Sequence, residues 1–77
     1  MNIYNKSKKK FNFMKDSRVP KNLHLCADLT KEYEKSINEM CPDYFKKGLF
    51  SDSINAFMQD FVESPEKYED IVNKLNE

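Results

Sequence analysis

His24 and Cys26 are the residues of this chain whose types and spacing come closest to a chemical site. They lie two positions apart, so in an extended segment both side chains lie on one face, where an imidazole and a thiolate are suitable zinc ligands. A structural zinc site needs four ligands, commonly in paired short spacings, and the other cysteine, Cys41, is distant. No fourth ligand has a helpful spacing. The sequence therefore predicts no metal site and two reduced thiols.

Catalytic patterns are also missing from the sequence. His24 is the only histidine, and no glycine-bearing nucleophile turn accompanies it. The only glycine, Gly48, cannot build a loop that cradles a phosphate group. The carboxylates fall mostly on predicted exposed helix faces, where solvation explains them. We expect a protein that is not an enzyme and that uses no cofactor.

The segment from Asn22 to Thr30, which contains His24 and Cys26, must be held by some element, and its pattern predicts a short β-strand. Leu23, Leu25 and Ala27 alternate with polar residues, and no other part of the 77 residues alternates in this way. An isolated strand is not stable in water, so the segment needs a partner.

Three explanations of this lone strand are open. The segment is an extended lead-in to a helix, or it adds to the sheet edge of another protein, or it pairs antiparallel with its own copy about a twofold axis. We favour self-pairing, because a chain of this size buries little apolar surface alone and two chains could bury their helical stripes together.

A first helix is predicted from about Lys31 to Cys41. Thr30 is its expected N-cap and Pro42 ends it. Its apolar stripe comprises Leu29, Tyr33, Ile37 and Met40, at spacings of four, four and three.

Two further helices follow the loop that contains Gly48. Ser51 is the expected N-cap of the second helix, and Ser64 followed by Pro65 predicts a third helix over about 65–76. The apolar stripe of the second helix comprises Ile54, Phe57, Met58, Phe61 and Val62. That of the third comprises Tyr68, Ile71, Val72 and Leu75.

Charge divides the chain into two parts, although its formal net charge is zero. Residues 1–21 carry seven basic and one acidic side chains, a net charge of +6, and residues 22–77 carry −6. The basic residues of the first part are Lys6, Lys8, Lys9, Lys10, Lys15, Arg18 and Lys21. We expect a mobile basic arm on an acidic body, which indicates either a polyanion partner or a solubilising tail.

The order of elements from about Asn22 to Val62 resembles the ribbon-helix-helix (MetJ/Arc) superfamily of DNA-binding repressors. This resemblance implies a mostly α-helical chain with one short strand, forming an intertwined homodimer whose two strands make an antiparallel ribbon in the DNA major groove. The predicted third helix is additional to that core. The implied dimer core comprises Leu23, Leu25, Ala27, Leu29, Tyr33, Ile37, Met40, Ile54, Phe57, Met58, Phe61 and Val62.

The resemblance also implies which residues contact DNA. Asn22, His24 and Cys26 would face base edges, with Asp28 outside the groove. The backbone N–H groups of Ser51, Asp52 and Ser53, at the start of the second helix, would bind a phosphate. Since the face toward the bases has no Arg or Lys, affinity would come largely from the arm, through Lys8, Lys9, Lys10, Lys15, Arg18 and Lys21.

The expected function is therefore sequence-specific binding of double-stranded DNA as a dimer, most simply as a transcriptional repressor on a pseudo-palindromic operator. Members of the superfamily are mostly prokaryotic, phage or plasmid regulators, which implies a cytoplasmic protein. No membrane span or signal peptide is expected, since no apolar run is long enough. The alternative is a small helical interaction protein, such as a phage-type inhibitor or an antitoxin-like adaptor, without a nucleic-acid role.

Overall fold

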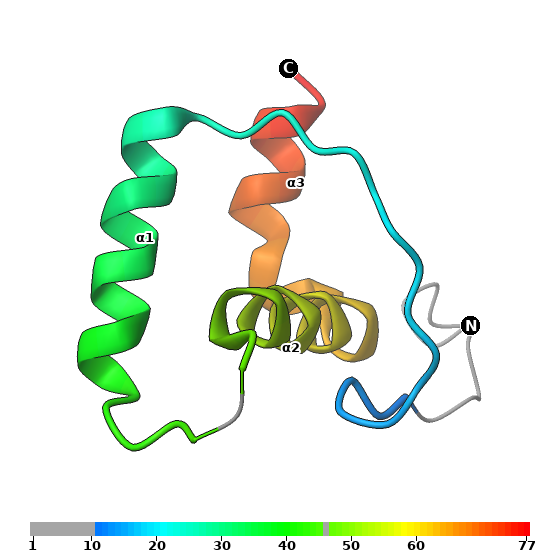
Figure 1. Cartoon of the computed structure of the whole chain (residues 1–77). Helices are drawn as coiled ribbons and strands as arrows, with labels where there is room; N and C mark the ends of the chain where they lie inside the picture. The colour runs from blue at the N-terminus through cyan, green and yellow to red at the C-terminus, as the bar shows by residue number, and fades with distance from the viewer. Residues whose placement is uncertain (1–10, 46) are drawn as a thin grey trace.

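The computed structural model describes residues 11–45 and 47–77, and these residues form a mostly helical chain (Figure 1). Helix α1 spans Ala27–Met40 and helix α2 spans Leu49–Glu63. A 3₁₀-helix, η2, spans Pro65–Tyr68 and leads directly into helix α3 at Glu69–Leu75. The prediction of a mostly α-helical protein is confirmed.

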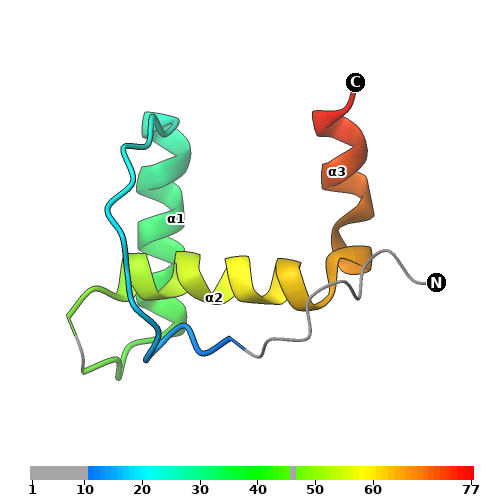
Figure 2. The same cartoon turned by 90° about the vertical axis from the view of Figure 1, so that its right-hand side faces the viewer.

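The helices form a U in which α2 is the base (Figure 2). Helices α1 and α3 rise from the two ends of α2 on the same side, and residues 19–26 run in extended form from the level of α2 to the start of α1. Contacts join α1 to α2, α2 to η2, and η2 to α3. Helix α2 is therefore the element against which the other described helices are placed.

Helix α1 begins earlier than predicted. Its N-cap is Cys26, and Thr30 lies inside the first turn, where both its backbone N–H and its hydroxyl donate to the Cys26 carbonyl. The assignment of Thr30 as N-cap is therefore wrong, and so is the strand assignment of residues 27–30. The helix ends at Met40, just before Pro42, as expected.

Helix α2 also begins earlier than predicted. Gly48 is its N-cap, with φ +88°, in the left-handed region that glycine reaches without steric cost. Ser51 is consequently in the first turn rather than at the N-cap, and this prediction is wrong. Ser64 does occupy the N-cap position of η2, but its side chain makes no capping hydrogen bond.

No strand is present among residues 11–45 and 47–77. Residues 22–26 are extended and exposed in the single chain, without a neighbouring strand to receive their backbone hydrogen bonds. This outcome is consistent with the expectation that the segment has no partner within its own chain. The intermolecular ribbon stays a prediction.

The described part of the chain has no buried hydrophobic residue. Its two buried residues are polar, Asp52 and Ser53, both on α2. The accessible surface of the chain is 7363 Å², whereas a compact monomer of 9.2 kDa exposes about 4900 Å². The radius of gyration of 14.6 Å likewise exceeds the ~11.5 Å of a compact domain of this length. The single chain therefore leaves an unusually large surface in water, and this surface includes many large hydrophobic side chains.

Polar contacts fix the corner between α2 and η2. Asp60 accepts hydrogen bonds from the hydroxyl of Tyr68 and from Nζ of Lys67, the latter at 3.1 Å. The ring of Phe61 packs on that of Tyr68, with centroids 5.6 Å apart. These contacts hold η2, and with it α3, against the C-terminal end of α2.

This corner should make stability depend on pH. The hydrogen bonds from Tyr68 and Lys67 hold the pKa of Asp60 below its ordinary value of 3.8. A carboxyl group whose pKa is lowered by folding stabilises the fold above its unfolded pKa and loses that effect as the pH falls through its folded pKa. We therefore expect Tyr68→Phe to lower stability in urea unfolding at about pH 6, and the difference from the unsubstituted protein to shrink at about pH 2.

Tyr33→Phe is the matched control, because its hydroxyl donates to Ser53, a group that does not titrate. Its effect on the free energy of unfolding should be the same at both pH values. A Tyr68→Phe effect that did not change with pH would contradict the assigned role of Asp60.

Candidate functional site

The first candidate feature is the set of apolar positions assigned to the dimer core. Eight of them are exposed large hydrophobic residues in the single chain, and of the twelve none is buried. The eight are Leu23, Leu25, Leu29, Met40, Phe57, Met58, Phe61 and Val62. Ala27 is also exposed, while Tyr33, Ile37 and Ile54 are half-buried. These residues come from the extended segment, α1 and α2, and their exposure to water is unfavourable.

Tyr33 makes the principal side-chain contact between α1 and α2. Its ring packs edge-on against Phe50, with centroids 5.6 Å apart, and lies 6.3 Å from the ring of Phe57. Its hydroxyl donates to Oγ of Ser53 at 2.5 Å, and Ser53 in turn donates to the Phe50 carbonyl at 2.7 Å. This chain of contacts sets the angle of the U at its α1 corner.

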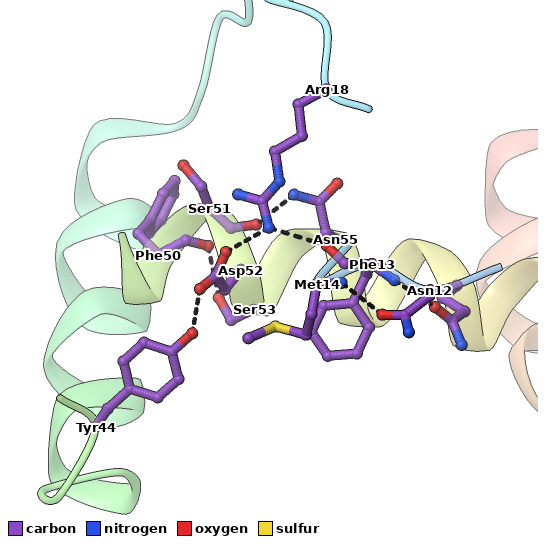
Figure 3. Close-up of polar contacts among 11 residues, drawn as sticks. Asn12, Phe13, Met14, Arg18, Tyr44, Phe50, Ser51, Asp52, Ser53 and Asn55 are labelled. Carbon is purple, nitrogen blue, oxygen red and sulfur yellow. Dashed lines mark hydrogen bonds and ion pairs between the residues drawn. The ribbon is translucent and has the colours of Figure 1, made fainter. Parts of the chain in front are cut away.

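The second feature is an ion pair on α2 (Figure 3). Nη2 of Arg18 donates to Oδ1 of Asp52 at 2.7 Å. The Asp52 side chain is only 8% exposed, and its other oxygen, Oδ2, accepts a hydrogen bond from the Tyr44 hydroxyl. That bond to the carboxylate is the main cause that raises the pKa of Tyr44. Asp52 of α2 thus contacts both the N-terminal part of the chain, through Arg18, and the loop before α2, through Tyr44.

Residues 11–18, here called the strap, lie against α2. Residues 12–16 form a self-contained turn, because the Asn12 carbonyl accepts from the N–H groups of Lys15 and Asp16. The Asp16 carboxylate accepts from the Asn12 N–H at 2.8 Å, which closes the turn. The Phe13 N–H donates to Oε1 of Gln59 on α2 at 3.0 Å.

Arg18 secures the strap at two points. Besides the Asp52 contact, its Nη2 donates to the Phe13 carbonyl at 2.9 Å. A groove of about 200 Å³ lies between the strap and α2, and its apolar lining includes Phe11, Phe13, Met58 and Val62. The strap thus lies beside Met58 and Val62 of the assigned dimer core, and both of these residues stay exposed.

The predicted base-contacting residues are accessible. Asn22, His24 and Cys26 are exposed in the extended segment, and Asp28 is exposed in the first turn of α1. Of these residues, Cys26 lines a pocket together with Phe50 and Ile54 of α2. Cys26 and Cys41 are free thiols, as expected.

The predicted phosphate-binding residues are arranged differently from the expectation. Because α2 starts at Leu49, the Asp52 N–H already donates to the Gly48 carbonyl at 2.9 Å. Asp52 and Ser53 are buried, whereas Ser51 is exposed. In the present conformation the free donors of the first turn belong to residues 49–51. These lie two residues earlier in the chain than the predicted set.

Among the basic residues, Lys15, Arg18 and Lys21 are exposed, and the Arg18 side chain is 44% accessible. The predicted contacts of Lys8, Lys9 and Lys10 lie outside the described residues. Sequence patterns did not indicate the Arg18–Asp52 pair, since its members are 34 positions apart and no local period connects them. The one local pattern that concerns Asp52 is the presence of an acidic residue near the start of an apolar helix, where a carboxylate is favourable.

The described residues contain no group of three or more His, Cys, Asp and Glu side chains arranged to hold a metal ion. Within the same residues no helix is long and apolar enough to cross a membrane. Comparison of the chain with protein-family models, with curated proteins and with solved structures found no match.

Proposed function

We propose that this protein is a dimeric ribbon-helix-helix DNA-binding protein that acts as a transcriptional repressor on a pseudo-palindromic operator. The observation that supports the proposal best is the exposure of the assigned dimer core. Leu29 is 68% exposed and Met40 is 79% exposed, although both belong to the apolar stripe of α1. An amphipathic helix without a partner for its stripe is poorly stabilised in water, so a second copy is the simplest partner.

The size of the exposed surface favours an extensive interface. The chain exposes about 2400 Å² more than a compact monomer of its mass. Obligate dimers bury 2000 Å² or more in total, and an intertwined dimer needs an area of this order. A small contact between two otherwise complete domains would leave most of this additional accessible surface in water.

The extended segment provides the proposed DNA-contacting ribbon. Asn22, His24 and Cys26 alternate with Leu23 and Leu25, so a ribbon formed with a second copy would place the polar set on one face and the leucines on the other. In the proposed dimer the polar face contacts base edges and the basic residues of positions 1–21 contact phosphates. Helix α3 would extend the dimer core through its exposed Ile71 and Leu75.

The solution mass at micromolar concentration tests the proposal first. Light scattering should give about twice the 9.2 kDa of one chain. A stably folded monomer would refute the ribbon-helix-helix assignment, because the proposed ribbon exists only between two copies. A dimer should next be titrated with duplex DNA at several salt concentrations, where a steep salt dependence is expected.

A second candidate function is a helical protein-interaction module without a nucleic-acid role. Two observations favour it: residues 22–77 carry a net charge of −6, and Arg18 is engaged by Asp52 within the chain. Such a protein would use the open apolar surface of α2 to bind another protein. It would show no salt-dependent affinity for DNA, which separates the two functions in the same titration.

A further inference from the structure

Arg18 is held by two acceptors through one nitrogen of its guanidinium group (Figure 3). Nη2 donates to Oδ1 of Asp52 at 2.7 Å and to the carbonyl oxygen of Phe13 at 2.9 Å. Within residues 11–45 and 47–77, these are the hydrogen bonds that the guanidinium group makes. A guanidinium group carries five N–H donors, so those on Nε and Nη1 are still free to bind a ligand. Because the Arg18 side chain is 44% accessible, an anion from solvent can approach the group while Asp52 stays bound to it.

The two acceptors that hold Arg18 are themselves fixed to α2. The Asp52 side chain is 8% exposed in the first turn of α2, and its Oδ2 atom accepts a hydrogen bond from the Tyr44 hydroxyl. Phe13 is tied to α2 through the hydrogen bond from its N–H to Gln59. An exposed arginine normally samples many rotamers, and a ligand that binds it must restrict them at an entropic cost. Here the chain itself restricts the guanidinium group before any ligand binds.

This fixed cation lies close in sequence to the proposed ribbon. Arg18 precedes Asn22 by four residues, which span at most about 14 Å of extended chain. Phosphate contacts determine where a protein sits on a duplex, whereas base contacts read the sequence. A phosphate bound by a fixed cation at this distance would set the register of Asn22 and His24 on the bases.

We propose that Asp52 is a positioning residue that holds Arg18 ready to bind a DNA phosphate through Nε and Nη1. This inference rests on the proposed DNA-binding function. It gives Asp52 a role through its carboxylate, where the resemblance implied a role for its backbone N–H. The carboxylate also repels a phosphate, but the guanidinium charge lies between the two anions, and water and salt weaken the repulsion at this exposed position. The fixed geometry therefore outweighs the repulsion.

Substitution of Asp52 should act on DNA binding in the direction opposite to the change of net charge. Asp52→Asn removes a negative charge, which by itself strengthens binding to a polyanion. It also replaces the charge-assisted hydrogen bond of Arg18 with a weaker one, so the guanidinium group becomes more mobile. We expect the loss of positioning to dominate, and Asp52→Asn to bind DNA more weakly.

The test is the affinity for a fluorescein-labelled 20-bp duplex, measured by fluorescence anisotropy on the full-length chain. Asp52→Asn should bind about three- to tenfold more weakly than the unsubstituted protein, which is the usual cost of restricting one long side chain on binding. Glu63→Gln is the charge-matched control, because Glu63 is exposed at the C-terminal end of α2. It should bind slightly more tightly, since it only removes a negative charge.

The same substitution in an Arg18→Ala background separates positioning from an effect on the fold. Without Arg18 the carboxylate has nothing to position, so Asp52→Asn should no longer weaken binding and should strengthen it slightly. Arg18→Ala alone should lower the slope of log K against log salt concentration by about 0.9, the value for one phosphate contact. Arg18→Lys keeps the charge but loses the planar fork, so it should keep the slope and bind about threefold more weakly.

Other results overturn the positioning role. If the unsubstituted protein binds DNA and Asp52→Asn binds as tightly as Glu63→Gln, Asp52 does not position Arg18 and only the proposed function stands. Equal weakening in both backgrounds would show that Asp52 acts on the fold and not through Arg18. An unchanged salt slope for Arg18→Ala would show that Arg18 does not bind a phosphate. If the unsubstituted protein and every variant fail to bind the duplex, the proposed function and the positioning role both fail.

Discussion

Replacing Leu29 with glutamate is expected to raise the dissociation constant of the proposed dimer at least about 100-fold. Leu29 is 68% exposed in the single chain, where a polar substitution at such a position changes stability by about 0.5 kcal/mol or less. In the proposed dimer the same side chain is buried with the rest of the stripe of α1. A carboxylate there would lack a partner, at a cost of about 3 kcal/mol or more, which corresponds to about 100-fold in affinity.

Phe45→Glu is the matched control for this experiment. Phe45 is 91% exposed in the loop before α2 and has no assigned place in the dimer core, so its substitution should have a smaller effect on association. Sedimentation equilibrium of both variants over a range of concentrations measures the comparison. Equal dissociation constants for Leu29→Glu and the unsubstituted protein would show that the stripe of α1 does not lie in the interface, and would remove the main support for the dimer.

The helices could be predicted from the sequence because the patterns that indicate them, apolar spacing and loop residues, are local. Apolar residues recur at three- and four-residue intervals from Ile54 to Val62, and all of them lie within α2. The loop that contains Gly48 was expected between the first two helices, and Gly48 adopts a positive φ at the start of α2. Each of these features depends on a few neighbouring residues and on the geometry of one helical turn.

Helices α1 and α2 begin earlier than their predicted capping residues indicate. Leu29 is the first member of the stripe that continues with Tyr33 and Ile37, so a helix that presents all three must include Leu29. The alternation of Ala27 and Leu29 with polar residues also fits a strand, and over so short a segment the two periods cannot be separated. In the single chain residues 27–30 are helical, because the hydrogen bonds of a helix need no second strand.

The strap could not be predicted, because its contacts join parts of the chain that are distant in sequence. Arg18 meets Asp52, and Phe13 meets Gln59, only after α2 has formed and the chain has turned back on it. The sequence indicated a mobile basic arm from its charge alone. Charge describes what a segment attracts in solution, but it does not identify the one carboxylate on the body that a given arginine will contact.

Replacing Lys8, Lys9 and Lys10 together with alanine is expected to weaken DNA binding to every sequence and to flatten its salt dependence. Each phosphate contact contributes about 0.9 to the slope of log K against log salt concentration, so three lost contacts should lower the slope by up to about 2.7. Near 0.1 M salt this corresponds to a loss of affinity of up to about 500-fold. Filter binding or anisotropy at four salt concentrations, with an operator and a random duplex, measures both quantities.

Asn22→Ala and His24→Ala should behave in the opposite way, because the proposed ribbon contacts bases rather than phosphates. A good bidentate contact to a base provides roughly 1–3 kcal/mol of discrimination, so the preference for operator over random DNA should fall about tenfold while the salt slope changes little. If both ribbon variants retained the full preference, these side chains would not make the specific contacts. If the lysine variant instead lost preference and kept its slope, sequence recognition would belong to the basic segment, and the exposed polar face of residues 22–26 would need another role.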